Sequence, residues 1–296
     1  MRGVVVALGN FDGVHLGHRE VVRRAVEEAR ARGVEAVVAT FDPHPRSVLR
    51  PAEEPGLLTT LEQRRELLLE LGADRVEVIR FDRELSLKSP EEFVREVLVG
   101  RLGADVVVVG ENFRFGHKAA GDVGDLARLM NEAGGEAVVV PVRGEGGGIS
   151  STRIRQLLAA GEVREAAALL GRPYALRGRV AVGDGRGRTI GVPTANVVPD
   201  ARVVVPARGV YAGYALFNGN RYAACTNVGV APTFGPRESR VESHLLGFDG
   251  NLYGRVVDVE FVERIRDETK FSGVEELVAR IRRDVEEARR ILGHSD

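Results

Sequence analysis

The sequence predicts two unlike domains, a doubly wound α/β domain followed by an all-β domain that ends in one helix. Its 296 residues exceed the roughly 100–200 that a single domain usually takes. Up to about residue 170, short valine-rich runs alternate with helical patterns, which is typical of a parallel sheet covered by helices. Beyond residue 171, glycine, proline and asparagine separate short strand-like runs. We therefore expect domains over residues 1–170 and 171–296.

Five strands and four helices are expected in the first domain. The strands, which lack polar alternation, cover residues 3–8, 35–41, 75–81, 105–110 and 136–142. The helical patterns between them cover residues 19–32, 61–71, 90–102 and 123–133. In the first of these, Val22, Ala25, Val26 and Ala29 recur at helical spacing. Right-handed βαβ units of this kind bind ligands beyond the carboxyl ends of their strands, so we look for chemistry in the loops that follow the strands.

Six strand-like runs and a closing helix are expected in the second domain. The runs cover residues 176–182, 202–205, 211–217, 221–228, 240–246 and 255–261. Short strands separated by turns predict an antiparallel barrel or sandwich. A helical segment over residues 161–170 precedes the border. An amphipathic helix over residues 274–292 closes the chain, with Leu277, Ile281 and Val285 on its apolar stripe.

Composition excludes several classes of protein. A hydrophobic content of 44% excludes an intrinsically disordered chain. The net charge of −1 provides no basic excess for a phosphate backbone, so we expect neither a nucleic-acid nor a membrane partner. The apolar runs have the length of strands, far below the roughly 18 residues of a membrane span.

Cysteine usage and the first residues indicate where the protein works. Cys225 is the only cysteine, which excludes a disulfide framework or a thiolate metal cluster and favours a reducing compartment. The apolar run before Gly9 is too short for a secretory signal. We therefore expect a cytoplasmic protein that acts on small molecules, either as a monomer or with weak self-association.

The first motif, G-N-F-D-G-V-H-L-G-H over residues 9–18, joins the first strand to the first helix. The N–H groups and the positive dipole at a helix start favour a phosphate. Gly17 lets a ligand approach the backbone, and His15 and His18 beside it can donate hydrogen bonds to phosphate oxygens. Two alternatives are that the histidines only cap and pack, or that they bind zinc, although no cysteine or further histidine cluster completes such a site. Strand, glycine-rich loop and helix follow in the order that a phosphate site needs, so we favour that site.

Three further motifs follow later strands of the first domain. T-F-D-P-H-P over residues 40–45 follows the second strand and is by itself an ordinary turn. G-E-N-F-R-F-G over residues 110–116 follows the fourth strand and offers an amide, an arginine and two aromatic rings for a planar ligand and its phosphates. I-S-S-T-R-I-R over residues 149–155 follows the fifth strand. A serine there can simply cap the next helix, but hydroxyl groups with Arg153 at a helix start also suit a triphosphate.

In this order, the four motifs closely resemble the FAD synthetase half of bacterial bifunctional riboflavin kinase/FAD synthetases, within the nucleotidyltransferase superfamily. The resemblance implies a Rossmann-like domain that transfers an adenylyl group from ATP to FMN and releases pyrophosphate. It implies that ATP is bound by Gly9, Asn10, Phe11, Asp12, Gly17, Ser151 and Thr152. It implies catalytic roles for His15, His18 and Arg153, and flavin contacts for Asn112, Phe113 and Arg114. Many members carry aspartate where this chain has Asn112, which puts a charged contact there in doubt.

The second domain carries another set of polar motifs, and the chain has no G-x-x-x-x-G-K-[ST] phosphate loop. G-D-G-R-G over residues 183–187 is not a dinucleotide fingerprint, because no helix follows it. Thr194 and Asn196 in P-T-A-N alternate onto one face if the chain is extended, and their oxygens suit Mg²⁺. Glu242, in a strand-like run, suits a base that accepts a proton from a hydroxyl nucleophile. Each feature is weak alone, because P-T-A-N is often a turn and a strand glutamate is usually solvated.

Further motifs strengthen this set, namely G-R-P-Y at residues 171–174, G-V-Y-A-G at 209–213, N-V-G-V-A-P-T-F-G at 227–235 and D-G-N-L-Y-G at 249–254. Together they resemble the riboflavin kinase domain. The resemblance implies a six-stranded Greek-key barrel, Mg²⁺ held by Thr194 and Asn196, and Glu242 as the base that deprotonates the ribityl hydroxyl. It also implies a mobile flap over ATP at residues 183–188, and ATP contacts from Gly183, Gly185, Arg188 and Gly191. Phe234 is a further candidate for a flavin contact, although aromatic residues are more often core.

The two resemblances cover nearly the whole chain and imply one reaction sequence. Riboflavin and ATP give FMN and ADP, and FMN with a second ATP gives FAD and pyrophosphate, with Mg²⁺ in both steps. Two other functions stay open: a nucleotidyltransferase with a different substrate, and a flavin-binding or sensory module whose sites are silent. Product formation from riboflavin, ATP and Mg²⁺ distinguishes the three.

Overall fold

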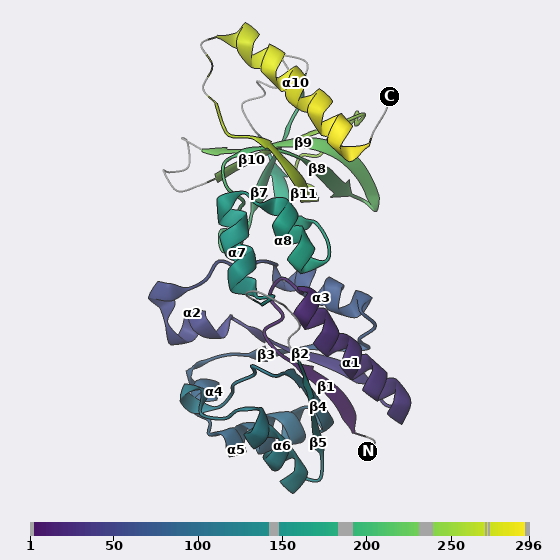
Figure 1. Cartoon of the computed structure of the whole chain (residues 1–296), viewed down its shortest axis with the longest axis vertical. Helices are drawn as coiled ribbons and strands as arrows, with labels where there is room; N and C mark the ends of the chain where they lie inside the picture. Colours follow the sequence, from purple (N-terminus) through teal and green to yellow (C-terminus); the bar gives the residue numbers. More distant parts are fainter. Residues whose placement is uncertain are drawn as a thin grey trace. The chain divides into compact units, whose positions relative to one another are not determined.

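The computed structural model describes residues 3–141, 148–182, 192–230, 239–269, 271 and 273–293. By contact, the chain forms one unit from Met1–Gly56 and Leu61–Ser151 and another from Leu57–Thr60 and Thr152–Asp296 (Figure 1). This division lies before the border that the sequence predicts near residue 171. The reason is that buried side chains of the helices α7 (Ser151–Ala160) and α8 (Val163–Leu170) belong to the core of the second unit.

A five-stranded parallel sheet forms the centre of the first unit. Its strands are β1 (Val4–Leu8), β2 (Ala36–Asp42), β3 (Arg75–Arg80), β4 (Ala104–Gly110) and β5 (Glu136–Val140). Their order is β3-β2-β1-β4-β5, and every neighbouring pair is parallel. The doubly wound fold predicted from the sequence is therefore confirmed. The winding reverses between β1 and β4, which is the point where ligands bind in sheets of this kind.

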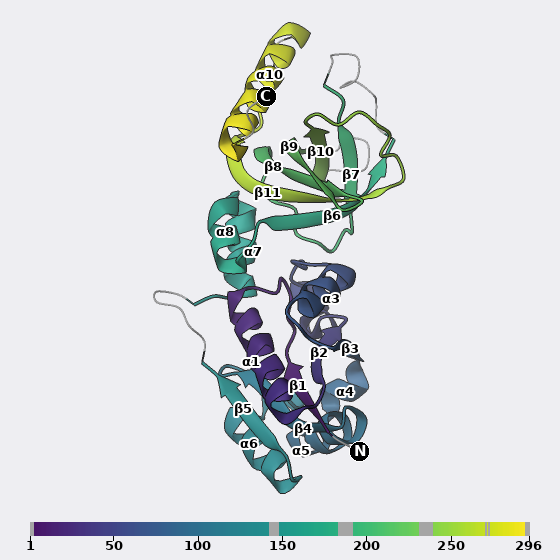
Figure 2. The same ribbon diagram turned by 90° about the vertical axis from the view of Figure 1, so that its right-hand side faces the viewer.

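Helices pack on both faces of this sheet (Figure 2). The longer helical segments are α1 (Leu16–Arg32), α3 (Leu61–Glu70), α6 (Val123–Glu132) and the π-helical segment Phe93–Arg101. Shorter ones are α2 (Pro45–Leu49), α4 (Arg83–Leu87), α5 (Pro90–Glu92) and the 3₁₀ turns Pro51–Glu53 and His117–Ala119. Side chains alternate across the sheet, so Val5 and Ala7 pack in one core cluster with α1, and Val6 and Leu8 pack in another with the π-helical segment.

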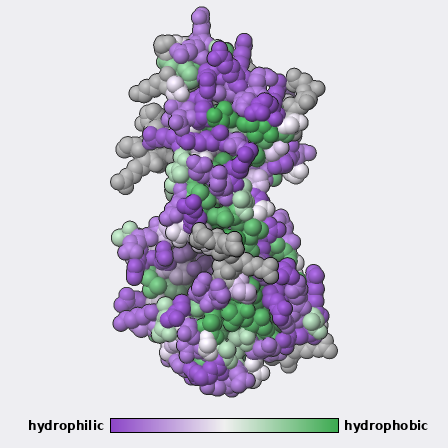
Figure 3. Space-filling view, in the orientation of Figure 1, coloured by the Kyte–Doolittle hydropathy of each residue, from purple (hydrophilic) through white to green (hydrophobic). Residues whose placement is uncertain are grey.

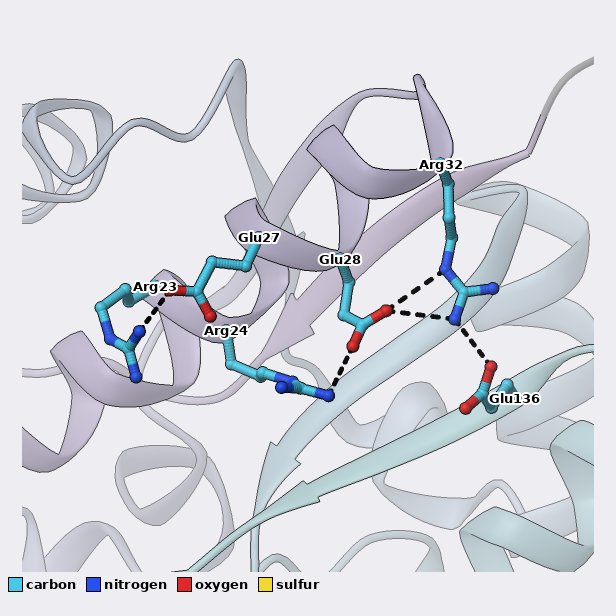
Figure 4. A network of polar contacts seen from close by, with 6 residues as sticks. All are labelled: Arg23, Arg24, Glu27, Glu28, Arg32 and Glu136. Carbon is cyan, nitrogen blue, oxygen red and sulfur yellow. Dashed lines mark hydrogen bonds and ion pairs between the residues drawn. The ribbon is translucent and has the colours of Figure 1, made fainter.

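The outer face of α1 carries a network of charged side chains (Figure 4). Arg32 lies 3.1 Å from Glu28 on the same helix and 2.8 Å from Glu136 on β5. Exposed pairs such as these are each worth less than about 1 kcal/mol. The face in Figure 3 is largely hydrophilic, with apolar residues in smaller groups. Among the described residues, no helix is both long and apolar enough to cross a bilayer.

The second unit is a closed barrel of six antiparallel strands in the order β10-β7-β6-β11-β8-β9. The strands are β6 (Tyr174–Ala181), β7 (Ala195–Pro199), β8 (Gly209–Phe217), β9 (Asn220–Val230), β10 (Ser239–Leu245) and β11 (Val256–Arg266). The predicted barrel and its strand number are confirmed, as is the closing helix α10 (Val274–Leu292).

One predicted strand of the barrel is wrong. Residues 202–205 form no strand, and β7 lies earlier, in the run that contains Asn196. Asp200 turns the chain after β7, because its side chain accepts from the Arg202 backbone N–H at 2.9 Å and its carbonyl accepts from Val203 at 2.9 Å. Val203 is nevertheless buried and bridges to Leu57, so its β-branched character serves the core.

Cys225 lies in a small apolar cluster that includes Val210 and Ala212 of β8 and Ala288 of α10. Burial raises the pKa of its thiol to about 12. Beside it, Asp284 of α10 is buried and lies 2.7 Å from Arg266 of β11. An apolar cluster and an ion pair therefore both join α10 to the barrel.

Candidate active sites

The first candidate site is a cavity of about 740 Å³ in the first unit. The loops that follow β1 and β4, the two strands at the switch point, both line it. They bring together Gly9 and Asn10 from the first loop with Asn112, Phe113 and Arg114 from the second. These five residues were predicted to bind ATP or flavin, and a volume of this size is typical of a small-molecule site.

Aromatic side chains form much of the wall of this cavity. Phe41 and Phe81 meet edge to face, with ring centroids 5.8 Å apart. Phe113 and Phe115 stack at 5.8 Å with their planes 13° apart. Flat apolar rings in such arrangements suit a planar aromatic ligand. Phe41 and Phe81 were not expected as ligand contacts, although both stand at the carboxyl ends of predicted strands, which is where ligands bind in such sheets.

The loop between β1 and α1 has an unusual backbone. Phe11, Gly13 and Val14 have positive φ angles of 49°, 84° and 43°. Two hydroxyl groups hold the loop from outside, because Thr40 donates to the carbonyl of Asn10 at 2.8 Å and Ser151 donates to the carbonyl of Asp12 at 3.0 Å. Residues other than glycine adopt left-handed backbone angles only at a cost in free energy, and such residues tend to occur at functional sites. The two hydroxyl hydrogen bonds help to stabilise this costly backbone conformation.

His15 and His18 come together at the start of α1. Their rings are stacked, with centroids 3.5 Å apart and planes 17° apart. Nδ1 of His15 accepts a hydrogen bond from the His18 backbone N–H at 3.2 Å, so His15 caps the helix as one alternative supposed. A Cβ at Gly17 would lie 3.3 Å from the His15 ring, which makes glycine the fitting residue there.

Burial, followed by the nearby His15 and Arg64, holds the pKa of His18 well below its usual value. Its buried Nδ1 has no hydrogen-bond partner among the residues that the structure describes. His18 is therefore neutral near pH 7, and an anionic ligand would favour its protonated form. The described residues contain no group of three or more His, Cys, Asp or Glu side chains that could hold a metal ion.

Arg64 is a charged residue of this site that belongs to no sequence motif. Arg64 and Asp12 are each only 1% exposed, with Nη2 of the arginine 3.7 Å from a carboxylate oxygen. Nη1 of Arg64 also donates to the hydroxyl of Thr40 at 3.3 Å and to the carbonyl of Phe41 at 3.2 Å. An arginine in a charged helical pattern is expected at the surface, so no local pattern predicts the burial of Arg64.

The predicted triphosphate residues lie at the start of α7. Ser151 belongs to the first unit and binds the loop after β1 through the bond to Asp12. Thr152 and Arg153 belong by contact to the second unit. Their roles toward ATP stay predictions.

The second candidate site lies on the barrel. Glu242 of β10 is paired directly opposite Asn196 of β7, and both line a cavity of about 240 Å³ together with Thr194. Opposite residues of paired strands point to the same face, and Thr194 directly precedes β7. The three predicted kinase residues are thus brought together. Hydroxyl and amide oxygens are donors that fit Mg²⁺, and a carboxylate beside them fits a base.

Arg240 completes this group, and no sequence motif singles it out. Its guanidinium lies 2.7 Å from a carboxylate oxygen of Glu242. Its Nε and Nη2 donate to the amide oxygen of Asn196 at 3.3 and 3.2 Å. The Asn196 oxygen therefore faces the Arg240 guanidinium.

Some predicted residues lie outside the residues that the structure describes. These are Gly183, Gly185, Arg188 and Gly191, which are expected to contact ATP, and Phe234, which is expected to contact the flavin. Their roles stay predictions.

Comparisons with known proteins agree with this division into two sites. The FAD synthetase family matches residues 1–153, and the riboflavin kinase family matches residues 170–292. Proteins named bifunctional riboflavin kinase/FMN adenylyltransferase are 38% identical in Bacillus subtilis (strain 168) and 40% identical in Escherichia coli (strain K12). Each match covers 98% of this chain and 93% of the relative. A crystal structure of a protein named macrolide-efflux protein, from Streptococcus pneumoniae, has a TM-score of 0.89 at 36% identity and covers 97% of this chain and 94% of that one.

Proposed function

Because the chain belongs to the bifunctional riboflavin kinase/FMN adenylyltransferase family, we propose that its two sites act in turn on one flavin. The protein is an enzyme of flavin cofactor biosynthesis that converts riboflavin to FMN and FMN to FAD, with ATP as the co-substrate of both steps. The barrel performs the first step and the α/β unit the second. We further propose that it works in the cytoplasm, where ATP is supplied.

In the α/β unit, the proposed reaction is attack of an FMN phosphate oxygen on the α-phosphorus of ATP. The new O–P bond forms as the bond to the bridging oxygen breaks and pyrophosphate leaves. A phosphate monoester is already anionic, so the step needs positioning and charge stabilisation and no general base. We assign the stabilisation to His15, His18 and Arg153. The phenylalanine wall of the cavity is the proposed seat of the flavin ring.

In the barrel, Glu242 is the proposed base. It accepts the proton of the ribityl 5′-hydroxyl as that oxygen attacks the γ-phosphorus of ATP and ADP leaves. Thr194 and Asn196 are the proposed residues that hold Mg²⁺, which when bound neutralises phosphate charge. The single observation that supports this assignment is the register of β7 and β10, which sets Glu242 opposite Asn196.

Two single variants test the assignment of one reaction to each unit. Glu242→Gln removes the base, so FMN formation should fall by about 10²–10⁴-fold while added FMN is still converted to FAD. His18→Ala should lower FAD formation by about 10²–10³-fold while FMN still forms. Chromatography of riboflavin, FMN and FAD after incubation with ATP and Mg²⁺ measures both. Loss of both activities in either folded variant would show that the sites are not independent.

A further inference from the structure

Arg240 of the barrel site contacts two of the residues to which a role in the kinase reaction is assigned. Val241, Ser243 and Leu245 of β10 are buried in the barrel, so Arg240 and Glu242 share the opposite face with Asn196. One guanidinium contacts both groups that the kinase reaction needs, the carboxylate at 2.7 Å and the amide oxygen at 3.2 and 3.3 Å.

The contact with Asn196 conflicts with metal binding. An amide oxygen has two lone pairs, and Nε–H and Nη2–H of Arg240 are directed at this one oxygen. A metal ion needs the same lone pairs, and a divalent ion close to a guanidinium is repelled by it. Arg240 and the metal therefore cannot both hold the Asn196 oxygen.

We propose that Arg240 is a positioning residue that takes the place of Mg²⁺ on Asn196 when no nucleotide is bound and releases this oxygen to the incoming metal–nucleotide. This inference rests on the proposed metal role of Asn196. The guanidinium holds the Asn196 amide and the Glu242 carboxylate on the same side of the site. The cost is weaker binding of the metal–nucleotide, because a favourable contact must first be broken.

The test is the affinity of the full chain for Mn²⁺·ADP, measured by the electron paramagnetic resonance of bound Mn²⁺ and by calorimetry. The chain has two proposed nucleotide sites, so two classes of bound Mn²⁺·ADP are expected. The class whose affinity falls in Asn196→Ala is assigned to the barrel site and is compared between variants. Arg240→Gln should bind in that class about three- to tenfold tighter, the size expected when one or two competing hydrogen bonds are lost. Arg240→Lys keeps the charge without the fork of donors, so its affinity for Mn²⁺·ADP should lie between those of the parent protein and Arg240→Gln.

A double variant and a matched control separate the outcomes. In the Asn196→Ala background, Arg240→Gln should give no gain, because the shared oxygen is gone. Arg221→Gln removes an equal charge from the Arg221–Glu260 pair elsewhere on the barrel and should change nothing. Unchanged or weaker binding by Arg240→Gln, with Asn196→Ala still weakening, overturns this inference alone. If Asn196→Ala weakens no class, the proposed metal residue is wrong and the inference falls with it.

Discussion

His18 is a buried neutral base at the start of a helix, and it makes the stability of the first unit depend on pH. Its pKa in the folded protein lies well below 6.5, whereas in the unfolded chain it is near 6.5. Below pH 6.5 the unfolded chain therefore binds a proton that the folded protein does not, and the free energy of unfolding falls as the pH falls. Above pH 6.5 this contribution is constant.

The variant His18→Gln should reduce this decrease between pH 6.5 and 5, as measured by denaturant unfolding at a series of pH values. Because an anionic ligand favours the protonated ring, ATP binding to the first unit should also take up protons, which calorimetry in two buffers detects. Equal pH profiles for His18→Gln and the parent protein would contradict the assignment.

The buried pair of Arg64 and Asp12 should stabilise the loop after β1 through a mechanism different from that of the surface pairs. Arg64→Leu leaves the Asp12 carboxylate buried without this cation, which typically costs about 3–5 kcal/mol. Arg128→Leu, on an exposed face with Glu132 at 2.9 Å, should cost less than about 1 kcal/mol. Denaturant unfolding of the first unit measures both, and similar losses for the two variants would contradict the expectation.

At the level of single residues, site side chains could be predicted where they belong to a sequence motif. They could not be predicted where only the packing of the folded chain gives them a role. His15, His18, Asn112 and Glu242 stand in recognisable loops or runs at strand ends. Arg64 and Arg240 are arginines in a chain with 42 basic residues, and only the packing shows that one is buried and the other lies on Asn196.

Among the elements, β8 needs a glycine at one position to pair with β11. A Cβ at Gly213 would lie 1.8 Å from the carbonyl oxygen of Glu260, so no side chain fits without moving the strand. Gly213→Ala should destabilise the barrel by about 1–3 kcal/mol or more. Gly273→Ser, at the start of α10 where a Cβ meets nothing within 4 Å, should be neutral or slightly stabilising because serine is the better cap. Thermal unfolding measures the change in midpoint temperature for each variant. Equal changes for the two variants would contradict the expected steric clash at Gly213.

Strands and helices could be predicted where the local pattern is unambiguous, as in the valine run of β4 and the helical periodicity of α10. Residues 202–205 show the limit, because Val203 is buried and Val204 and Val205 are partly buried although these residues form no strand. Likewise, α8 reads as the end of the α/β pattern, yet Val163, Ala166 and Leu170 are buried in the barrel core. Which core an amphipathic helix joins is decided by long-range packing, which a local pattern does not contain.

For the whole molecule, two units with a cavity each predict that the reactions can be supplied by different copies of the chain. A mixture of the Glu242→Gln and His18→Ala proteins should produce FAD from riboflavin, because FMN made by one copy can reach the other. Neither variant alone should do so. The yield of FAD in the mixture, relative to the parent protein at equal concentration, measures how freely FMN leaves the barrel, and no FAD at all would mean that FMN is not released.

The lone thiol under α10 offers a way to observe that helix. A thiol reagent attacks the thiolate, and at Cys225 burial disfavours the thiolate as well as access to it. Modification therefore requires α10 to detach from the barrel, so the rate of labelling reports how often α10 detaches while the rest of the protein stays folded. For the same reason, a cysteine placed on any exposed loop would be the one to react first, and either unit can carry a spectroscopic label without removal of the native residue.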